Sequence, residues 1–152
     1  MNDAELTRAL ERGEIDNEAF HHASHLRVAW VYLSESGSVD EAADKMRDTL
    51  RRFAASAGKL EKYHETITLF WVRFLGRGYA TNSVKTLEEL VQTNPQLLEK
   101  RFPLAYYSAE RLFSDHARTA WVEPDLKPLS FDATAPCSSN SPGDTPDRTL
   151  PR

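Results

Sequence analysis

Residues 38–58, SVDEAADKMRDTLRRFAASAG, decide the fold class of this chain. Their apolar side chains recur at the spacing of one helix face, and most charged side chains fall on the other faces. The apolar set is Val39, Ala42, Ala43, Met46, Leu50, Phe53 and Ala57. A period of about 3.6 residues predicts an amphipathic helix rather than a strand. Ser38 and Glu41 predict a capping box at its start, and Gly58 predicts its end.

The segments on both sides carry the same start and stop signals. A first short helix is predicted from Asn2, with Glu5 completing a capping box, to Gly13. A second runs from Asp16 or Asn17 to about residue 36, where Gly37 stops it. A fourth covers about 59–75 and is closed by Gly76 and Gly78. Because the connections are short, the second, third and fourth helices should pack as antiparallel neighbours.

Shorter elements follow Gly78. A helix capped by Thr81 or Asn82 is predicted to reach about Thr93, and Asn94-Pro95 indicates a further helix start. Residues 104–121 are predicted to be helical, with breaks near Ser108 or Ser114. Pro124 and Pro128 impose an extended segment over 123–129.

Residues 132–152 are almost all small or polar, and disorder is expected there. The predicted fold is therefore all-α, a compact antiparallel helical bundle with short extra helices and a disordered C-terminal tail. The expected domain organisation is a single helical domain over 1–131, followed by the tail.

Charge and composition exclude several classes of function. The 152-residue chain has a net charge of −4 and no concentrated basic run, so nucleic-acid binding is not expected. No apolar run reaches the roughly 20 residues that span a bilayer. The polar N-terminus is unlike a signal peptide, so a cytoplasmic location is expected. A single cysteine, Cys137, forms no internal disulfide. The oligomeric state is left open.

A cluster of histidines indicates a candidate metal site. His21, His22 and His25 lie on one arc of the predicted second helix together with Glu18. Residues three or four apart on a helix lie on adjacent turns, where two imidazoles can share one ion. Either His21 or His22 can pair with His25, and Glu18-x-x-His21 has the spacing of di-metal carboxylate bundles.

The predicted fourth helix adds His64, on the same face as Leu60, Ile67 and Trp71, with Glu61 three residues before it and Glu65 beside it. Mixed shells of histidine and carboxylate suit Fe, Mn or Zn. The candidate ligands are thus His21, His22, His25, His64, Glu18, Glu61 and Glu65, around a divalent ion of unknown identity. The alternative for a lone inward histidine such as His64 is a core residue that is hydrogen-bonded through both nitrogens.

Two segments carry a resemblance. Residues 20–30, FHHASHLRVAW, and residues 63–68, YHETIT, resemble those of an uncharacterised family of small all-helical bacterial proteins. Tyr107-Ser108, Ala117-Arg118 and 124–126 belong to the same pattern, which covers about residues 10–130. The resemblance implies no activity, substrate or cofactor.

Three hypotheses of function follow. The first is a metal-binding helical protein with a histidine-rich interior site, as in a small non-haem metalloenzyme. The second is a metal-free protein that binds a small molecule or uses His64 or His25 as an acid or base. The third is a non-enzymatic interaction module that recruits a partner through the tail or an exposed helix face. Whether the protein is an enzyme is left open.

Overall fold

The computed structural model of this chain describes residues 2–80 and 85–129. Over these ranges it contains seven α-helices, four 3-10 helices (η) and no strand, which confirms the predicted all-α fold. The α-helices are α1 (Asp3–Glu11), α2 (His22–Glu35), α3 (Val39–Ser56), α4 (Glu65–Ala80), α5 (Leu87–Thr93), α6 (Ala109–Leu112) and α7 (Asp115–Thr119). The 3-10 helices are η1 (Asn17–Ala19), η2 (Leu60–Lys62), η3 (Pro95–Leu98) and η4 (Phe102–Ala105).

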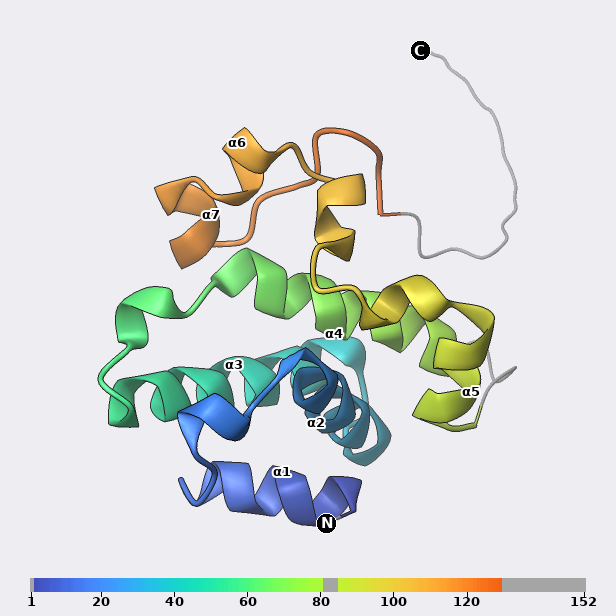
Figure 1. The fold of residues 1–152 in the computed structure, drawn as a ribbon. Helices are drawn as coiled ribbons and strands as arrows, with labels where there is room; N and C mark the ends of the chain where they lie inside the picture. The colour runs from blue at the N-terminus through green and yellow to red at the C-terminus, as the bar shows by residue number, and fades with distance from the viewer. Residues whose placement is uncertain (1, 81–84, 130–152) are drawn as a thin grey trace.

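Helices α2, α3 and α4 pack on one another and form the centre of the molecule. Helices α3 and α4 run antiparallel and are joined through η2 (Figure 1). Helix α2 is seen almost end-on in the same view and crosses this pair, a geometry that the short connections alone do not specify. Helix α1 packs on α2 and α3, and α7 packs on α4 from the other side. No helix among the described residues is long and apolar enough to cross a membrane.

The helix ends follow the sequence closely. Asn2 and Glu5 form the predicted capping box of α1, with two hydrogen bonds of 2.8 Å. The Ser38 hydroxyl accepts from the backbone N–H of Glu41, but the Glu41 carboxylate accepts from Gly37 rather than Ser38. Only half of that predicted capping box therefore forms. Gly13 and Gly58 end α1 and α3 as predicted, each with φ of +72°, the left-handed region that favours glycine.

The second helix begins later than predicted. Residues 17–19 form η1, and α2 starts only at His22, with His21 as its N-cap residue. Phe20 lies between the two elements and packs on Phe53 of α3, at 5.3 Å between ring centroids. This tertiary contact replaces the helical turn that the sequence predicts, so Glu18 and His21 do not lie on α2.

The fourth helix begins at Glu65, later than predicted. It also ends later than predicted, because its glycines serve packing rather than termination. Helix α4 continues through Gly76 and Gly78 to Ala80. A Cβ atom on Gly76 would lie 2.7 Å from Val39 Cγ2, and one on Gly78 would lie 2.8 Å from Leu90 Cδ1. Both distances are shorter than ordinary contacts, so the absent side chains let α4 approach α3 and α5 closely.

The C-terminal part is built from short, individually capped elements. Helix α5 begins at Leu87, with Thr86 and Glu89 as its capping box, and the predicted caps Thr81 and Asn82 lie outside the described residues. The breaks predicted at Ser108 and Ser114 are confirmed, since these hydroxyls cap α6 and α7. Residues 120–129 contain no helix, as the prolines predict. Cys137 and the tail lie outside the described residues.

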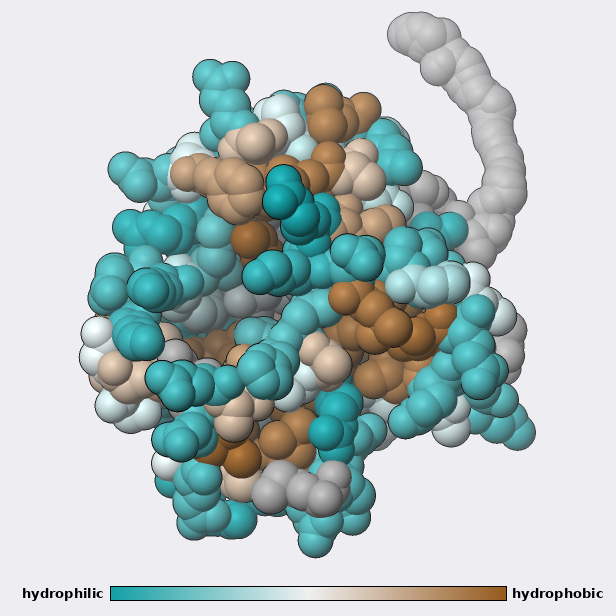
Figure 2. Space-filling view, in the orientation of Figure 1, coloured by the Kyte–Doolittle hydropathy of each residue, from teal (hydrophilic) through white to brown (hydrophobic). Residues whose placement is uncertain are grey.

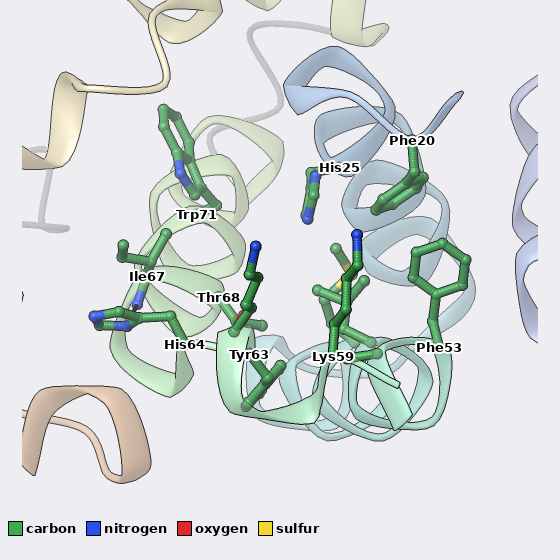
Figure 3. A pocket seen from close by; sticks show the side chains of 13 residues that line it. Phe20, His25, Phe53, Lys59, Tyr63, His64, Ile67, Thr68 and Trp71 are labelled. Atoms are coloured by element: carbon green, nitrogen blue, oxygen red, sulfur yellow. Dashed lines mark hydrogen bonds between the residues drawn. The ribbon is translucent and has the colours of Figure 1, made fainter. Parts of the chain in front are cut away.

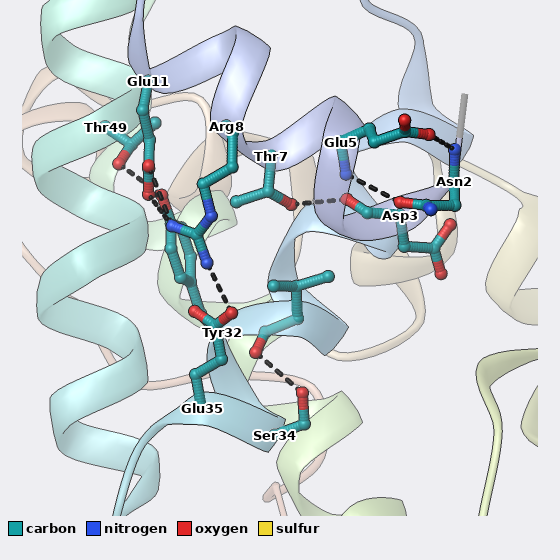
Figure 4. A network of polar contacts seen from close by, with 11 residues as sticks. Asn2, Asp3, Glu5, Thr7, Arg8, Glu11, Tyr32, Ser34, Glu35 and Thr49 are labelled. Carbon is teal, nitrogen blue, oxygen red and sulfur yellow. Dashed lines mark hydrogen bonds and ion pairs between the residues drawn. The ribbon is translucent and has the colours of Figure 1, made fainter.

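A polar network joins α1 to α2 and α3 (Figure 4). The Tyr32 hydroxyl, which is buried, donates to Glu11 at 2.5 Å and lies 2.7 Å from Thr49 Oγ1. Because Tyr32 has one proton and gives it to a carboxylate, Thr49 is the donor to Tyr32. Arg8 pairs with both Glu11 and Glu35 and closes the network.

Candidate functional site

A cavity of about 410 Å³ lies where η2 and the ends of α2, α3 and α4 meet. Its size falls within the roughly 300–1,000 Å³ of small-molecule pockets. The space-filling view shows the surface hollowed between α3 and the first half of α4 (Figure 2). The lining consists of aromatic and aliphatic side chains, two lysines and a few polar groups: Phe20, His25, Met46, Leu50, Phe53, Ala54, Lys59, Lys62, Tyr63, His64, Ile67, Thr68 and Trp71. These described residues include no Asp or Glu. We call this space the His25 cavity.

The end of α3 places the two lysines at the cavity. Gly58 adopts a left-handed conformation, its N–H bonds to Ala55, and the N–H of Lys59 bonds to Ala54 at 2.8 Å. This pair of bonds is the Schellman arrangement, which turns the chain sharply after a helix. The turn leads directly into η2, so Lys59 and Lys62 stand across the cavity from α2. Lys59 points into the space between His25 and Phe53 (Figure 3).

His25 presents an open nitrogen to the cavity. Its Nδ1 lies 3.2 Å from the carbonyl oxygen of His21, and since a carbonyl only accepts, Nδ1 carries the proton. Nε2 therefore holds a lone pair, and no described residue donates to it. The ring lies between Trp71 and Phe20 (Figure 3), with its centroid 4.4 Å from that of Phe20. Burial lowers the pKa of His25 from 6.5 to about 4, so the imidazole is neutral near pH 7.

His64 is occupied on both nitrogens. Nε2 donates to the carbonyl of Leu112 at 2.7 Å, and Nδ1 accepts the backbone N–H of Ile67 at 3.1 Å. Its ring thereby joins the start of α4 to the end of α6. Burial lowers its pKa, which favours the neutral form that both bonds require. His64 therefore has the bonds expected of the alternative to a metal ligand, a core histidine that is hydrogen-bonded through both nitrogens.

The other predicted ligands lie apart from one another. His22 Nε2 donates to the Leu97 carbonyl at 2.9 Å, and burial lowers its pKa. His21, Glu18 and Glu61 are exposed. Glu65 is buried and accepts from Arg47 at 2.6 Å and from Tyr63 at 2.7 Å.

The predicted ligands therefore do not form one cluster. Across residues 2–80 and 85–129, no three His, Cys, Asp or Glu side chains are grouped so that they could hold a metal ion. The spacing argument required Glu18 and His21 on α2, and Glu61 and His64 on α4, and all four precede those helices. A metal centre at these residues remains a prediction, which metal analysis of tag-free protein tests.

A second cavity, of about 500 Å³, adjoins the first. Three side chains, His25, Ile67 and Trp71, line both spaces. The remaining lining residues of the second cavity are apolar or basic: His22, Lys100, Arg101, Pro103, Leu104, Leu112 and Phe113. We call this space the Phe113 cavity.

Sequence reasoning identified His25 as part of a candidate site but missed the cations and aromatic walls around it. No role is predicted for Lys59 or Lys62 from the sequence, and Trp71 is predicted only to lie on the helix face that carries His64. Gly58 could have indicated the position of the two lysines. A glycine that ends a helix turns the chain sharply, so the lysines that follow it, Lys59 and Lys62, are brought back beside the helices.

No match is found among protein-family models, curated proteins or solved structures. The resemblance carried by residues 20–30 and 63–68 stays a prediction.

Proposed function

We propose that this protein binds a small organic anion in the His25 cavity. The observation that carries the proposal is an unprotonated His25 Nε2 facing a cavity lined by two lysines and by no described carboxylate. A chain with a net charge of −4 has more acidic than basic side chains to place around a cavity. A lining with only basic charges therefore favours a negatively charged ligand.

The cavity walls define the rest of the ligand. Phe20, Phe53 and Trp71 offer ring faces and edges that suit an aromatic or aliphatic body. The ammonium groups of Lys59 and Lys62 suit a carboxylate or phosphate. His25 Nε2 can only accept, so the ligand should carry an O–H or N–H group within reach of it. The ligand class is thus an apolar acid with one further hydrogen-bond donor.

Binding is favoured over catalysis by the state of His25. A general base works best when its pKa lies near the working pH, and burial holds the pKa of His25 at about 4. His64 cannot serve as a base while both of its nitrogens are bonded. A neutral, fixed acceptor is suited to recognising a donor group on a ligand.

Titration calorimetry with three matched probes tests the proposal: 3-(4-hydroxyphenyl)propionate, 3-phenylpropionate and 3-phenylpropionamide. The hydroxylated acid should bind most tightly, because a hydrogen bond worth about 0.5–1.5 kcal/mol changes Kd by roughly two- to twelvefold. The amide should bind most weakly, because it lacks the charge.

Two variants separate the contributions. His25→Leu should remove the preference for the hydroxylated acid and leave the preference for acid over amide. Lys59→Gln with Lys62→Gln should remove the preference for acid over amide. Lys45→Gln with Lys85→Gln makes the same change in charge away from the cavity and should alter neither. Equal affinities for all three probes, or no binding of any, would refute the proposal.

A further inference from the structure

The two cavities are separated by one layer of side chains. His25, Ile67 and Trp71 face the His25 cavity on one side and the Phe113 cavity on the other. Trp71 is buried, whereas His25 and Ile67 are only partly buried, so solvent reaches the boundary between the two cavities at these two side chains. A ligand longer than the His25 cavity would extend past Ile67 into the neighbouring space.

The Phe113 cavity has the same kinds of lining groups as the His25 cavity. Its walls are apolar, and Phe113 keeps 61% of its surface exposed at the rim, an exposure that an apolar ligand would reduce. Lys100 and Arg101 supply its charges, and no described Asp or Glu lines it. Glu99 lies close enough to influence His22 but is not part of the lining.

A hydrogen bond ties the backbone that precedes this second pair of cations to α2. Lys100 and Arg101 occupy the turn between η3 and η4. The fully buried Leu97 and the bond from His22 to its carbonyl tie that turn to the start of α2. Each cation pair thus lines one of two adjoining cavities, and neither pair is among the three side chains that line both.

We propose that the two cavities form one site for an elongated molecule that has an acidic group at each end and, between them, a mostly hydrocarbon body with one hydrogen-bond donor for His25 Nε2. One acid lies at Lys59 and Lys62, the other at Lys100 and Arg101, and the body crosses at Ile67. This inference rests on the proposed function and names the ligand class more narrowly. It predicts one molecule per chain, because the two acidic groups of a single ligand occupy both cation pairs.

Calorimetry with dodecanedioate and dodecanoate, both below micelle-forming concentrations, tests this inference. Both probes lack a donor for His25 Nε2, so the contribution of that bond cancels when their affinities are compared. The diacid should bind with a stoichiometry of one and about tenfold more tightly than the monoacid, since it adds ion pairs with a second cation pair. In a series of diacids from eight to sixteen carbons, affinity should pass through a maximum where the length fits both ends. A continuous rise with length would show hydrophobic attraction alone and would overturn the proposal.

A charge variant distinguishes this inference from the proposed function. The double change Lys100→Gln with Arg101→Gln should weaken the binding of dodecanedioate about tenfold. It should leave 3-(4-hydroxyphenyl)propionate unaffected, because that probe fits within the His25 cavity. Unchanged diacid affinity, or two diacid molecules per chain, would overturn the two-cavity site while the proposed function stands. Failure of the unaltered protein to bind any acid would overturn both.

Discussion

The two ends of α2 carry polar groups of opposite kinds. Near its C-terminal end, Tyr32 lies in the network with Glu11 and Thr49, where each hydroxyl has a partner. Near its N-terminal end, His25 turns one nitrogen to a cavity where no described residue bonds to it. An acceptor that has no partner within the protein is satisfied by solvent or by a ligand, so His25 Nε2 is available to a molecule that enters the cavity.

If His25 binds a ligand as proposed, this difference assigns stability to one end of the helix and binding to the other. The Tyr32 network should stabilise the fold and be indifferent to ligands, whereas His25 should govern ligand binding and add little to stability. Four predictions test this division, ordered from the largest expected change in free energy of unfolding to the smallest.

Tyr32→Phe should lower the free energy of unfolding by about 1–3 kcal/mol, because Glu11 and Thr49 lose a buried partner. Urea denaturation measures the change. In the Tyr32→Phe background, Thr49→Val should lower the free energy of unfolding by less than it does in the unaltered protein, because the Thr49 hydroxyl has already lost its partner. Probe binding in the His25 cavity should be unchanged. Altered probe affinity in Tyr32→Phe would show that the two ends are coupled.

Gly76→Ala tests the packing that holds α4, and with it one cavity wall, against α3. The new Cβ would lie 2.7 Å from Val39 Cγ2. Alanine gains about 1 kcal/mol in helix propensity, but overpacking costs about 1–3 kcal/mol, so a net loss of about 1 kcal/mol is expected. In a Val39→Ala background the same change should be neutral or stabilising. Thermal denaturation of the unaltered protein, the two single variants and the double variant measures these effects. If Gly76→Ala lowers stability equally with Val39 and in the Val39→Ala background, the packing role is contradicted.

The pH dependence of stability tests the buried state of His25. Its folded pKa of about 4 lies below the ordinary 6.5, so between these values the unfolded chain binds more protons. Stability should therefore fall as pH drops from 6.5 toward 4. His22 and His64, whose pKa values are also lowered, act in the same direction.

His25→Leu should reduce that acid-induced loss by about 1 kcal/mol or more, since one pKa unit corresponds to about 1.4 kcal/mol. Urea titrations at pH 6.5 and pH 4.5 measure it. Met46→Leu, which alters the same cavity without removing a titratable group, is the control. Equal losses in His25→Leu and the unaltered protein would contradict the burial argument.

The smallest effect is expected at an exposed ion pair. Arg52 and Asp48 lie one turn apart on α3 at 3.0 Å, and both side chains are more than half exposed. Arg52→Ala should change the free energy of unfolding by less than about 0.5 kcal/mol, because solvent screens such pairs. A loss as large as that of Tyr32→Phe would show that exposure does not separate the two kinds of polar contact.

Local signals in the sequence were enough to predict the helical class and most helix ends. Asn2, Gly13 and Gly58 act within a few residues of themselves, so their roles could be predicted without knowing the fold. Ser108 and Ser114 likewise cap the helices that follow them. Gly76 and Gly78 resembled the same stop signals but lie inside α4, because neighbouring helices require their missing side chains.

The candidate site depended on contacts between residues far apart in the sequence. By itself, the sequence determined that the chain is helical, where most helices stop, and that His64 points inward. Only the tertiary structure decided that Phe20 would interrupt the second helix, that Leu112 would occupy His64, and that Lys59 would face His25. Caps and periodicity are local properties of the backbone, whereas a binding site is made by side chains that packing alone brings together.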